Sequence, residues 1–452
     1  MKAVLLAAGR SFRMQPIADK NFLKFLGKPL IVHQLESLLA ASFSEILIVG
    51  GAHNMAQLKK VLRECSLPNR PSHSEAKPIM CPKGATLAKI TVREQKDLDL
   101  GMAGAVLTAA SWIKNDPFLV VSSNDVVDIS TYNILTKSLK KGEGVLMAKK
   151  VSAYFPGGYL KTRPSGIVSS IIEKPGAGKE PSKLVNIVMH YHPEPKRLFT
   201  LLKQEAGSKN QHDDRYELAL QSLFDAGVIY KAMPFEGFWQ PVKYPWHVLS
   251  LMNYFLKAGK KFARKKVSIS KTATLHGDVF LEEGVRILDN AVIVGPAYIG
   301  KNSIIATDAL VRESHIGANC VIGFGSEVAR SYVGDEVWTH TNYIGDSVIG
   351  NDVSFGAGTV TGNLRLDEKN ILVTIRGEKA DSGLNKFGLV TGNHVRVGIN
   401  TSFMPGVKIG SHSFVGAGIT VAEDIPDSMF VTGKHTLVMK PNKAQAAPRK
   451  TQ

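Results

Sequence analysis

Aliphatic side chains recur every six residues in the second half of the chain, and this period limits its fold more than any other feature. The first run is Leu275, Leu281, Ile287, Ile293, Ile299, Ile305 and Val311. The second is Val397, Phe403, Ile409, Val415 and Val421, in which one phenylalanine takes an aliphatic position. Because six is an even number, these side chains all point to one side of an extended strand, whereas a helix would spread them around its axis. The period therefore predicts a parallel β-helix, in which each rung covers the aliphatic side chains of the next.

Two further features refine this half. Glycine often follows the aliphatic position, as in Ile299-Gly300 and Ile409-Gly410, which suits tight turns at the corners of such a solenoid. The segment 364–391 interrupts the repeat. We expect it to form a loop or arm that projects from the prism, because insertions in solenoids often lie on a functional face.

The first half has a different pattern. Short apolar runs at 3–7, 45–49 and 118–122 predict buried strands, and amphipathic stretches at 30–41 and 103–112 predict helices between them. Strands that alternate with helices indicate an α/β fold with a mostly parallel sheet covered on both faces. Ligands of such sheets bind beyond the carboxyl ends of the strands, so we expect the chemistry to lie there.

The change of pattern divides the chain. We expect a first domain at 1–258, a basic linker at 259–268, a β-helix domain at 269–430 with its arm at 364–391, and a basic tail at 431–452.

Charge and cysteine content restrict the partners. The 56 lysines and arginines outnumber the 39 acidic residues, which gives a net charge of +17 and favours polyanionic ligands such as nucleotides, sugar phosphates or coenzyme A. The basic residues are dispersed and form no nucleic-acid-binding module, so we do not expect nucleic acid as a partner. No apolar run reaches the roughly 18 residues of a membrane span. Cys65, Cys81 and Cys320 fit neither a disulfide framework nor a zinc site. These features are typical of a cytoplasmic protein.

The first predicted strand leads into a motif suited to phosphate. Small residues after a strand let backbone N–H groups approach a phosphate, and arginine adds positive charge. The motif comprises Leu6, Ala7, Ala8, Gly9, Arg13, Lys20 and Gly27-Lys28-Pro29. It resembles the opening of sugar-1-phosphate nucleotidylyltransferases, which have a Rossmann-like fold with a mixed, mostly parallel sheet. The resemblance implies that Leu6, Ala8 and Gly9 contact the nucleotide.

Further motifs of that family follow in order up to about residue 255. Those expected to bind the nucleotide base are Gln95 and Gly101, and those expected to bind the sugar phosphate are Gly158, Glu173 and Asn186. Tyr244-Pro245-Trp246 resembles the closing motif of the domain. Asp125, at the end of a strand, resembles the family's Mg²⁺ ligand.

The resemblance also implies a mechanism. An oxygen of a sugar 1-phosphate attacks the α-phosphorus of a nucleoside triphosphate, and catalysis consists mostly of positioning and charge neutralisation. Arg13 would neutralise the leaving pyrophosphate, Lys20 would bridge the reacting phosphates, and Asp125 would hold Mg²⁺. From residue type alone, Asp125 could instead cap a helix and Lys20 could be a solvated lysine.

Three of the motifs depart from the family pattern. Ser11-Phe12 replaces the usual Gly-Thr before the arginine, and Asn124 replaces the glycine before the metal ligand. The family's Trp-x-Asp, whose aspartate completes the magnesium site, reads Trp239-Gln240-Pro241. Lys243 lies nearby and is a candidate to replace the metal's charge.

The β-helix carries a second set of motifs. The segment 338–363 includes His340, Tyr343, Gly345-Asp346 and Asn363, and Lys386 lies in the predicted arm. This pattern resembles the acetyltransferase region of the bifunctional enzymes that make UDP-N-acetylglucosamine, and especially their archaeal relatives. The resemblance implies a left-handed β-helix that forms homotrimers, with acetyl-CoA bound between neighbouring prisms. His340 would be the general base, because the pKa of imidazole lies near operating pH, and Tyr343, Asn363 and Lys386 would hold the sugar phosphate.

Together these motifs predict an enzyme that N-acetylates an amino-sugar 1-phosphate and joins the product to a nucleoside triphosphate, with UTP as the best candidate. Two alternatives stay open. One is a glucose- or mannose-1-phosphate nucleotidylyltransferase whose β-helix is purely structural. The other is a regulatory subunit that binds sugar nucleotide without turnover.

Overall fold

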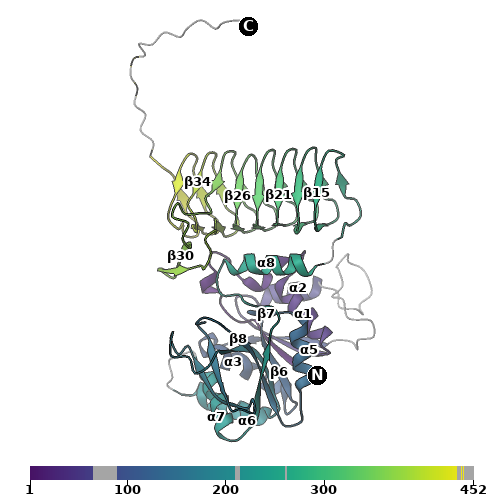
Figure 1. The fold of residues 1–452 in the computed structure, drawn as a ribbon, viewed down its shortest axis with the longest axis vertical. Coiled ribbons are helices and arrows are strands. Elements are labelled where there is room, and N and C mark those ends of the chain that lie inside the picture. The colour runs from purple at the N-terminus through teal and green to yellow at the C-terminus, as the bar shows by residue number, and fades with distance from the viewer. Residues whose placement is uncertain (65–88, 209–213, 260–261, 435–438, 440, 442–452) are drawn as a thin grey trace.

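The computed structural model describes residues 1–64, 89–208, 214–259 and 262–434, with Met439 and Pro441. An α/β domain forms one end of the molecule and a long prism of stacked rungs lies across its other end (Figure 1). Cys65, Cys81 and nearly all of the predicted basic tail lie outside the described residues, whereas Cys320 is a buried free cysteine in the prism.

The α/β domain is built on the predicted mixed sheet, which has nine strands. The order is β10-β9-β11-β6-β1-β4-β5, with β8 between β11 and β12. β1 pairs in parallel with β4 and β6, whereas β11 runs antiparallel to β6. The strands are β1 (Lys2–Leu6), β4 (Glu45–Gly51), β5 (Lys89–Gln95), β6 (Phe118–Ser122), β8 (Gly144–Lys150), β9 (Gly158–Thr162), β10 (Val168–Glu173), β11 (Leu184–His192) and β12 (Tyr230–Phe235).

Helices cover both faces of this sheet because successive residues of its strands point to opposite sides. Ala3 and Leu5 pack into one buried cluster, and Val4 and Leu6 pack into the other. The first face is covered by α1 (Leu30–Ala40), α2 (Met55–Glu64) and α5 (Ile129–Ser138). The second is covered by α3 (Gly101–Thr108), α4 (Ala110–Ile113), α6 (Pro195–Ala206) and α7 (Arg215–Asp225).

The helix predicted at 103–112 differs from the structure. It begins earlier, at Gly101, and divides into α3 and α4 around Ala109. Thr108 Oγ1 donates a hydrogen bond to the Gly104 carbonyl oxygen at 2.9 Å. Such bonds from a side chain to the preceding turn compete with the helical backbone ladder and bend helices.

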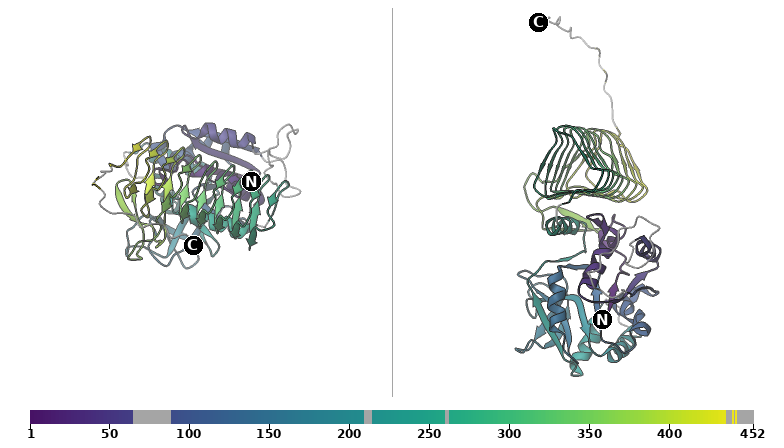
Figure 2. Two further views of the ribbon diagram at one scale, coloured as in Figure 1. Left: turned by 90° about the horizontal axis from the view of Figure 1, so that it is seen from above. Right: turned by 90° about the vertical axis from the view of Figure 1, so that its right-hand side faces the viewer.

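The second half is the predicted left-handed parallel β-helix, with a triangular cross-section (Figure 2). The faces that turn away from the α/β domain are formed by two sets of strands. The first is β15 (Thr274–His276), β18 (Val292–Val294), β21 (Leu310–Arg312), β24 (Glu327–Ala329), β26 (Tyr343–Gly345), β29 (Val360–Thr361), β34 (Ser402–Phe403) and β37 (Thr420–Val421). The second is β14 (Ser268–Ile269), β17 (Arg286–Ile287), β20 (Ile304–Ile305), β23 (Val321–Ile322), β28 (Ser354–Phe355), β33 (Arg396–Val397), β36 (Phe414–Val415) and β38 (Phe430–Val431).

The third face, which we call the interface sheet, turns toward the α/β domain. Its strands are β16 (Val279–Leu281), β19 (Ala297–Ile299), β22 (His315–Ile316), β25 (Tyr332–Val333), β27 (Val348–Ile349), β32 (Val390–Thr391) and β35 (Lys408–Ile409). The aliphatic residues of the six-residue period fill the prism. The interval fails between the two runs because some turns are shorter: Ile299 pairs with Ile316, and Val333 pairs with Ile349. The rungs also begin inside the predicted linker, since Ala263 already bridges to Leu281.

Aromatic rings occupy several neighbouring outward positions of the interface sheet. The rings of Tyr298, His315 and Tyr332 stack in series, with centroids 4.6 and 5.0 Å apart. Phe25, in the short hairpin of β2 (Lys24–Phe25) and β3 (Lys28–Pro29), lies 5.6 Å from Tyr332 and 4.9 Å from Phe255 of α8 (His247–Ala258). These rings form a buried core between the two domains, so the prism and the α/β domain pack as one unit.

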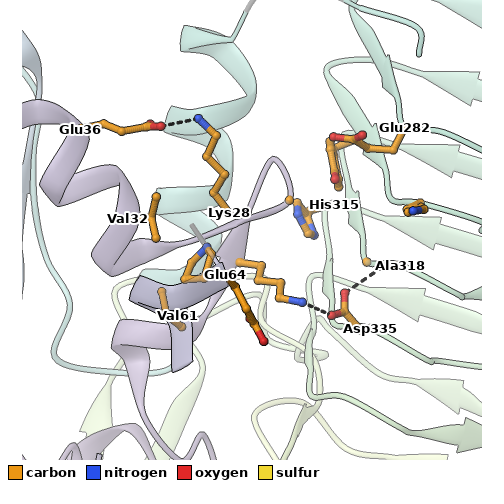
Figure 3. A pocket seen from close by; sticks show the side chains of 15 residues that line it. Lys28, Val32, Glu36, Val61, Glu64, Glu282, His315, Ala318 and Asp335 are labelled. Atoms are coloured by element: carbon orange, nitrogen blue, oxygen red, sulfur yellow. Dashed lines mark hydrogen bonds and ion pairs between the residues drawn. The ribbon is translucent and has the colours of Figure 1, made fainter. Parts of the chain in front are cut away.

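Polar residues flank this core. Lys24 forms an ion pair of 2.6 Å with Asp335, and Lys28 forms one of 2.7 Å with Glu36. The two pairs line a pocket between α1, α2 and the prism, which His315 also borders (Figure 3). Gly27, Lys28 and Pro29 of the first predicted motif line this pocket, whereas none of the residues predicted to be catalytic, to bind substrate or to bind metal does.

The interruption at 364–391 forms the expected arm, but the arm folds toward the α/β domain. It contains a hairpin of β30 (Leu372–Ile375) and β31 (Glu378–Asp381), which lies beside α8 (Figure 1). Val373 and Phe387 are fully buried, and the Phe387 ring lies 6.3 Å from Trp246. Apolar contacts with the first domain therefore fix the arm in place.

We expect Phe25→Ala to lower the free energy of unfolding by about 3–5 kcal/mol, since it leaves a cavity in the core between the domains. Differential scanning calorimetry measures the effect as an earlier transition. Phe414→Ala is the control, because that ring is 52% exposed and its loss should cost no more than about 0.5 kcal/mol. Equal effects of the two substitutions would contradict the proposed contribution of the interface.

Candidate active sites

The first site lies where β1 and β6 end. Ser123 N donates to the Leu6 carbonyl oxygen at 2.9 Å, which joins the two strand ends. Ala8 is buried, whereas Gly9 is exposed, and a Cβ added to Gly9 would meet no atom within 4 Å. The Ala8-Gly9 backbone therefore borders open space, where a ligand could approach it.

The short helix η1 (Phe12–Met14) carries Arg13 to this edge. Buried Met14 anchors the helix, and the Arg13 guanidinium lies 5.6 Å over the Tyr244 ring. Ser11 has a φ of 54°, a left-handed conformation that explains why the family usually has glycine there. Phe12 is half exposed, with the Arg10 guanidinium 5.6 Å over its ring. The bulky side chain in place of threonine is thus accommodated at the surface.

Lys20 begins the helix η2 (Lys20–Phe22) and is buried, so it is not the solvated lysine that residue type left open. Its Nζ donates to the Val242 carbonyl oxygen at 3.1 Å. Burial lowers the pKa of Lys20 to about 8, because a low-dielectric environment disfavours the ammonium, and the carboxylate of Asp19 opposes this shift. Asp19 is itself held by Asn54 Nδ2 at 2.8 Å.

Asp125 begins β7 (Asp125–Val127), which pairs with β13 (Trp239–Pro241). Its Oδ1 accepts a hydrogen bond from Trp239 Nε1 at 2.8 Å. Burial raises the pKa of Asp125, while the Trp239 hydrogen bond and the charge of Lys243 oppose that shift. Asp125 does not cap the following helix, since Asp128 accepts from Thr131 N at the start of α5.

Arg13, Lys20 and Asp125 lie near one another, because the charges of Arg13 and Asp125 both act on the pKa of Lys20. Within the described residues, no three His, Cys, Asp or Glu side chains gather as a metal site. If Asp125 holds Mg²⁺ as predicted, substrate phosphates would supply further ligands, since Mg²⁺ commonly binds through one or two carboxylates together with substrate phosphates. Buried Ser123 Oγ and Asn21 Oδ1 have no hydrogen-bond partner in the described part of the chain, which fits a site for a polar ligand.

Gln95 and Gly101 meet at the end of β5. Gln95 Nε2 donates to the carbonyl oxygens of Asp97 and Gly101, at 2.8 and 2.9 Å. Gly101 has a φ of +53° that favours glycine. The glutamine therefore shapes the turn with its amide nitrogen, and its proposed contact with the base remains a prediction.

Gly158, Glu173 and Asn186 lie together on β9, β10 and β11. A Cβ added to Gly158 would lie 3.0 Å from Glu173 Oε2 and 3.6 Å from Asn186 Cβ. His190 was not predicted from the sequence. Its Nε2 lies 2.8 Å from Asn186 Oδ1, and its Nδ1 lies 2.8 Å from the Tyr216 hydroxyl. Burial lowers the pKa of His190 to about 3, so the neutral ring orients the Asn186 amide. The alternating His190-Tyr191-His192 on an otherwise apolar strand was the available signal.

The second site lies on the prism, with His340 at the corner opposite the interface sheet. Asn342 is buried beneath this corner: its Oδ1 accepts from His340 N at 2.7 Å and its Nδ2 donates to the Gly356 carbonyl oxygen at 2.8 Å. His340 itself is exposed. The turn is therefore rigid, and the imidazole is open to a ligand.

Tyr343 and Asn363 come together on the adjacent face. Asn363 Nδ2 donates to the Tyr343 hydroxyl at 3.2 Å and also to the Asp346 carboxylate. Arg330, which was not predicted from the sequence, donates two parallel hydrogen bonds of 2.7 Å to the Asp346 carboxylate. This pairing fixes the carboxylate and places a guanidinium beside the predicted sugar-phosphate residues.

Neither the Lys386 nor the His340 side chain forms a hydrogen bond to this cluster among the described residues. Lys386 is exposed in the arm, where it bridges to Leu364, and Phe387 N donates to the Asn363 carbonyl oxygen at 2.9 Å. The arm therefore brings Lys386 next to Asn363 along the backbone.

Comparison with known proteins covers both halves. Residues 2–242 match the sequence model of the nucleotidyl transferase family. "Bifunctional protein GlmU" of Methanococcus vannielii is 31% identical over 97% of this chain and 99% of its own length. This chain belongs to the GlmU family. The Sulfurisphaera tokodaii "Bifunctional sugar-1-phosphate nucleotidylyltransferase/acetyltransferase" is also 31% identical, over 94% of this chain and 98% of that protein.

Two more distant similarities were also found. The GlmU protein of Bartonella quintana is 22% identical over 97% of this chain and 95% of its own length. A crystal structure of UDP-glucose pyrophosphorylase complexed with UDP-glucose matches 57% of this chain and 99% of that chain, with a TM-score of 0.48 and 20% identity.

In the described part of this GlmU-family chain, no helix is both long and apolar enough to cross a membrane.

Proposed function

We propose that residues 1–258 transfer a nucleotidyl group from UTP to N-acetylglucosamine 1-phosphate, and that residues 269–430 acetylate glucosamine 1-phosphate with acetyl-CoA. The observation that carries the proposal is the similarity to bifunctional relatives, which extends through both halves of the chain. Polyanionic substrates on both sides also agree with a net charge of +17.

In the nucleotidyl transfer, an oxygen of the sugar 1-phosphate attacks the α-phosphorus and pyrophosphate leaves. Arg13 neutralises the pyrophosphate, Lys20 bridges the reacting phosphates, and the Ala8-Gly9 backbone receives the nucleotide. Glu173 and Asn186 hold the sugar. Mg²⁺, held by Asp125, would supply positive charge to the phosphates when bound.

In the acetyl transfer, His340 takes a proton from the sugar amine as the nitrogen attacks the thioester carbonyl carbon. The carbon–sulfur bond breaks, and coenzyme A leaves as a thiol. Tyr343, Asn363 and Lys386 hold the sugar phosphate while the reaction proceeds.

We also propose a homotrimer, with acetyl-CoA bound between neighbouring prisms. Near His340, Phe324 and Trp338 are 60% and 58% exposed, an amount of uncovered aromatic surface that favours association. Sedimentation of the full chain tests this proposal, and a monomer at working concentration would contradict it.

The experiment for the whole proposal is incubation with UTP, glucosamine 1-phosphate, acetyl-CoA and Mg²⁺, with all products identified by mass. We expect coenzyme A, pyrophosphate and UDP-N-acetylglucosamine. Pyrophosphate from glucose 1-phosphate or mannose 1-phosphate without coenzyme A release would favour a purely structural prism. A regulatory protein is the second candidate because Pro241 replaces a carboxylate, and binding of UTP with no turnover would favour it.

We expect the kcat/KM of nucleotidyl transfer to fall as pH rises through about 8, the pKa to which burial lowers Lys20. The ammonium, which binds phosphate, is present below this pH and is lost above it. Pyrophosphate release measured from about pH 7 to about pH 9.5 tests the prediction. Lys20→Arg should remove the decline, because arginine keeps its charge throughout this range. A flat wild-type profile would contradict the assignment.

A further inference from the structure

The residue paired with Asp125 across the two strands offers no metal ligand. In the antiparallel pair of β7 and β13, Pro241 lies directly opposite Asp125. Proline has neither a side-chain donor or acceptor nor a backbone N–H. Any charge on this strand next to Asp125 must therefore come from the residues that follow Pro241.

Those residues are held firmly. Val242 N donates to the Asn124 carbonyl oxygen at 2.7 Å, and the Val242 carbonyl oxygen accepts from Lys20 Nζ at 3.1 Å. Lys243 N donates to His247 Nδ1 at 3.1 Å. Hydrogen bonds on both sides thus fix the backbone from which the Lys243 side chain extends.

The Lys243 side chain extends from Asp125 toward the sugar-binding strands. Its Nζ lies 4.5 Å over the Phe155 ring and donates to the Pro156 carbonyl oxygen at 3.2 Å, two residues before Gly158. In the described part of the chain, this carbonyl is its one hydrogen-bond acceptor. An ammonium has three N–H donors, so two are left for a ligand.

The two free N–H donors of the Lys243 ammonium suit an anionic ligand such as a phosphate. Asp125 and Glu173 are both close enough to act on the pKa of this ammonium, as are the positive charges of Arg13 and Lys174. Asp125 belongs to the predicted metal site and Glu173 to the predicted sugar site. The ammonium thus lies between the place where the nucleotide is activated and the place where the sugar is held.

We propose that Lys243 is a further catalytic residue of the nucleotidyl transfer. Its ammonium binds the phosphate of the sugar 1-phosphate, and it supplies there the positive charge that a metal held by two carboxylates would otherwise supply. The inference rests on the proposed function of the first domain. Binding of the phosphate by Lys243 leaves the covalent step unchanged, since the sugar phosphate oxygen still forms the new bond to the α-phosphorus as pyrophosphate leaves.

Binding of UDP-N-acetylglucosamine in EDTA, measured by titration calorimetry, tests the proposal without turnover or metal. We expect Lys243→Met to weaken binding about tenfold or more, the effect of one lost charge-assisted hydrogen bond, and Lys243→Arg to restore most of it. Lys137→Met is the matched control, since Lys137 is exposed on α5. Melting curves of all variants show whether each has folded.

A reciprocal variant tests the exchange of lysine for metal. Pro241→Asp combined with Lys243→Met recreates a second carboxylate opposite Asp125. We expect Mg²⁺ to strengthen binding of the nucleotide sugar to this double variant by about fivefold or more, and to strengthen binding to the wild type less. Equal effects of Mg²⁺ on both proteins would overturn the exchange.

Different results would overturn the role of Lys243 and the proposed function of the first domain. If the wild type binds UDP-N-acetylglucosamine and releases pyrophosphate, but Lys243→Met binds and reacts as the wild type does, only the role of Lys243 is overturned. If the wild type forms no product from any sugar 1-phosphate, the proposed function itself fails.

Discussion

Replacement of His340 with alanine is expected to lower the rate of acetyl transfer by about 10²–10⁴, the usual contribution of a general base. The amine must lose a proton as its nitrogen attacks the thioester, and the exposed imidazole at the rigid corner is placed to take it. The folding cost should be small, because the Asn342 side chain binds the backbone of His340 and not its ring. Coenzyme A release with glucosamine 1-phosphate measures the effect.

The same variant carries an internal control. Nucleotidyl transfer, measured as pyrophosphate release from UTP and N-acetylglucosamine 1-phosphate, should change little, since His340 lies at the prism corner farthest from the α/β domain. His276→Ala removes another exposed prism histidine and should leave both rates near those of the wild type. Undiminished coenzyme A release by His340→Ala would remove the proposed role.

Replacement of Arg13 with alanine is expected to lower nucleotidyl transfer by about 10²–10³, the usual cost of losing one preorganised group that stabilises transition-state charge. The guanidinium lies over the Tyr244 ring, and it is close enough to Lys20 for its charge to act on the pKa of that lysine. Pyrophosphate release measures the effect, and acetyl transfer should be unchanged. Arg13→Lys should recover part of the rate, because a point charge cannot reproduce bidentate binding.

The control for Arg13 is Arg197→Ala. Arg197 lies in α6, which follows β11, and β11 ends beside the start of β6 at the opposite edge of the sheet. It forms an exposed ion pair with Glu194 at 3.2 Å, whose loss should cost no more than about 1 kcal/mol. A similar loss of activity in both variants would show that Arg13 acts through the net charge of the domain and not through the site.

Some of the site could be inferred from motif order alone, and some could not. The order of motifs was enough to bring Arg13, Lys20 and Asp125 to one edge, because parallel strands that follow one another end at the same side of their sheet. The supporting residues were not predicted. His190 acts through Asn186, and Arg330 acts through Asp346, which are contacts between side chains that no motif spacing specifies.

The sequence by itself determined the two folds. Apolar periods of two, six and about 3.6 residues indicate on which face of a strand or helix each side chain lies. The sequence did not determine what the outward side of a strand faces. Only the tertiary structure decided that Tyr298, His315 and Tyr332 form a buried interface, that the arm folds onto α8, and that Pro241 lies opposite Asp125. These three arrangements depend on contacts between segments far apart in the chain, and a local period does not specify which distant segments come into contact.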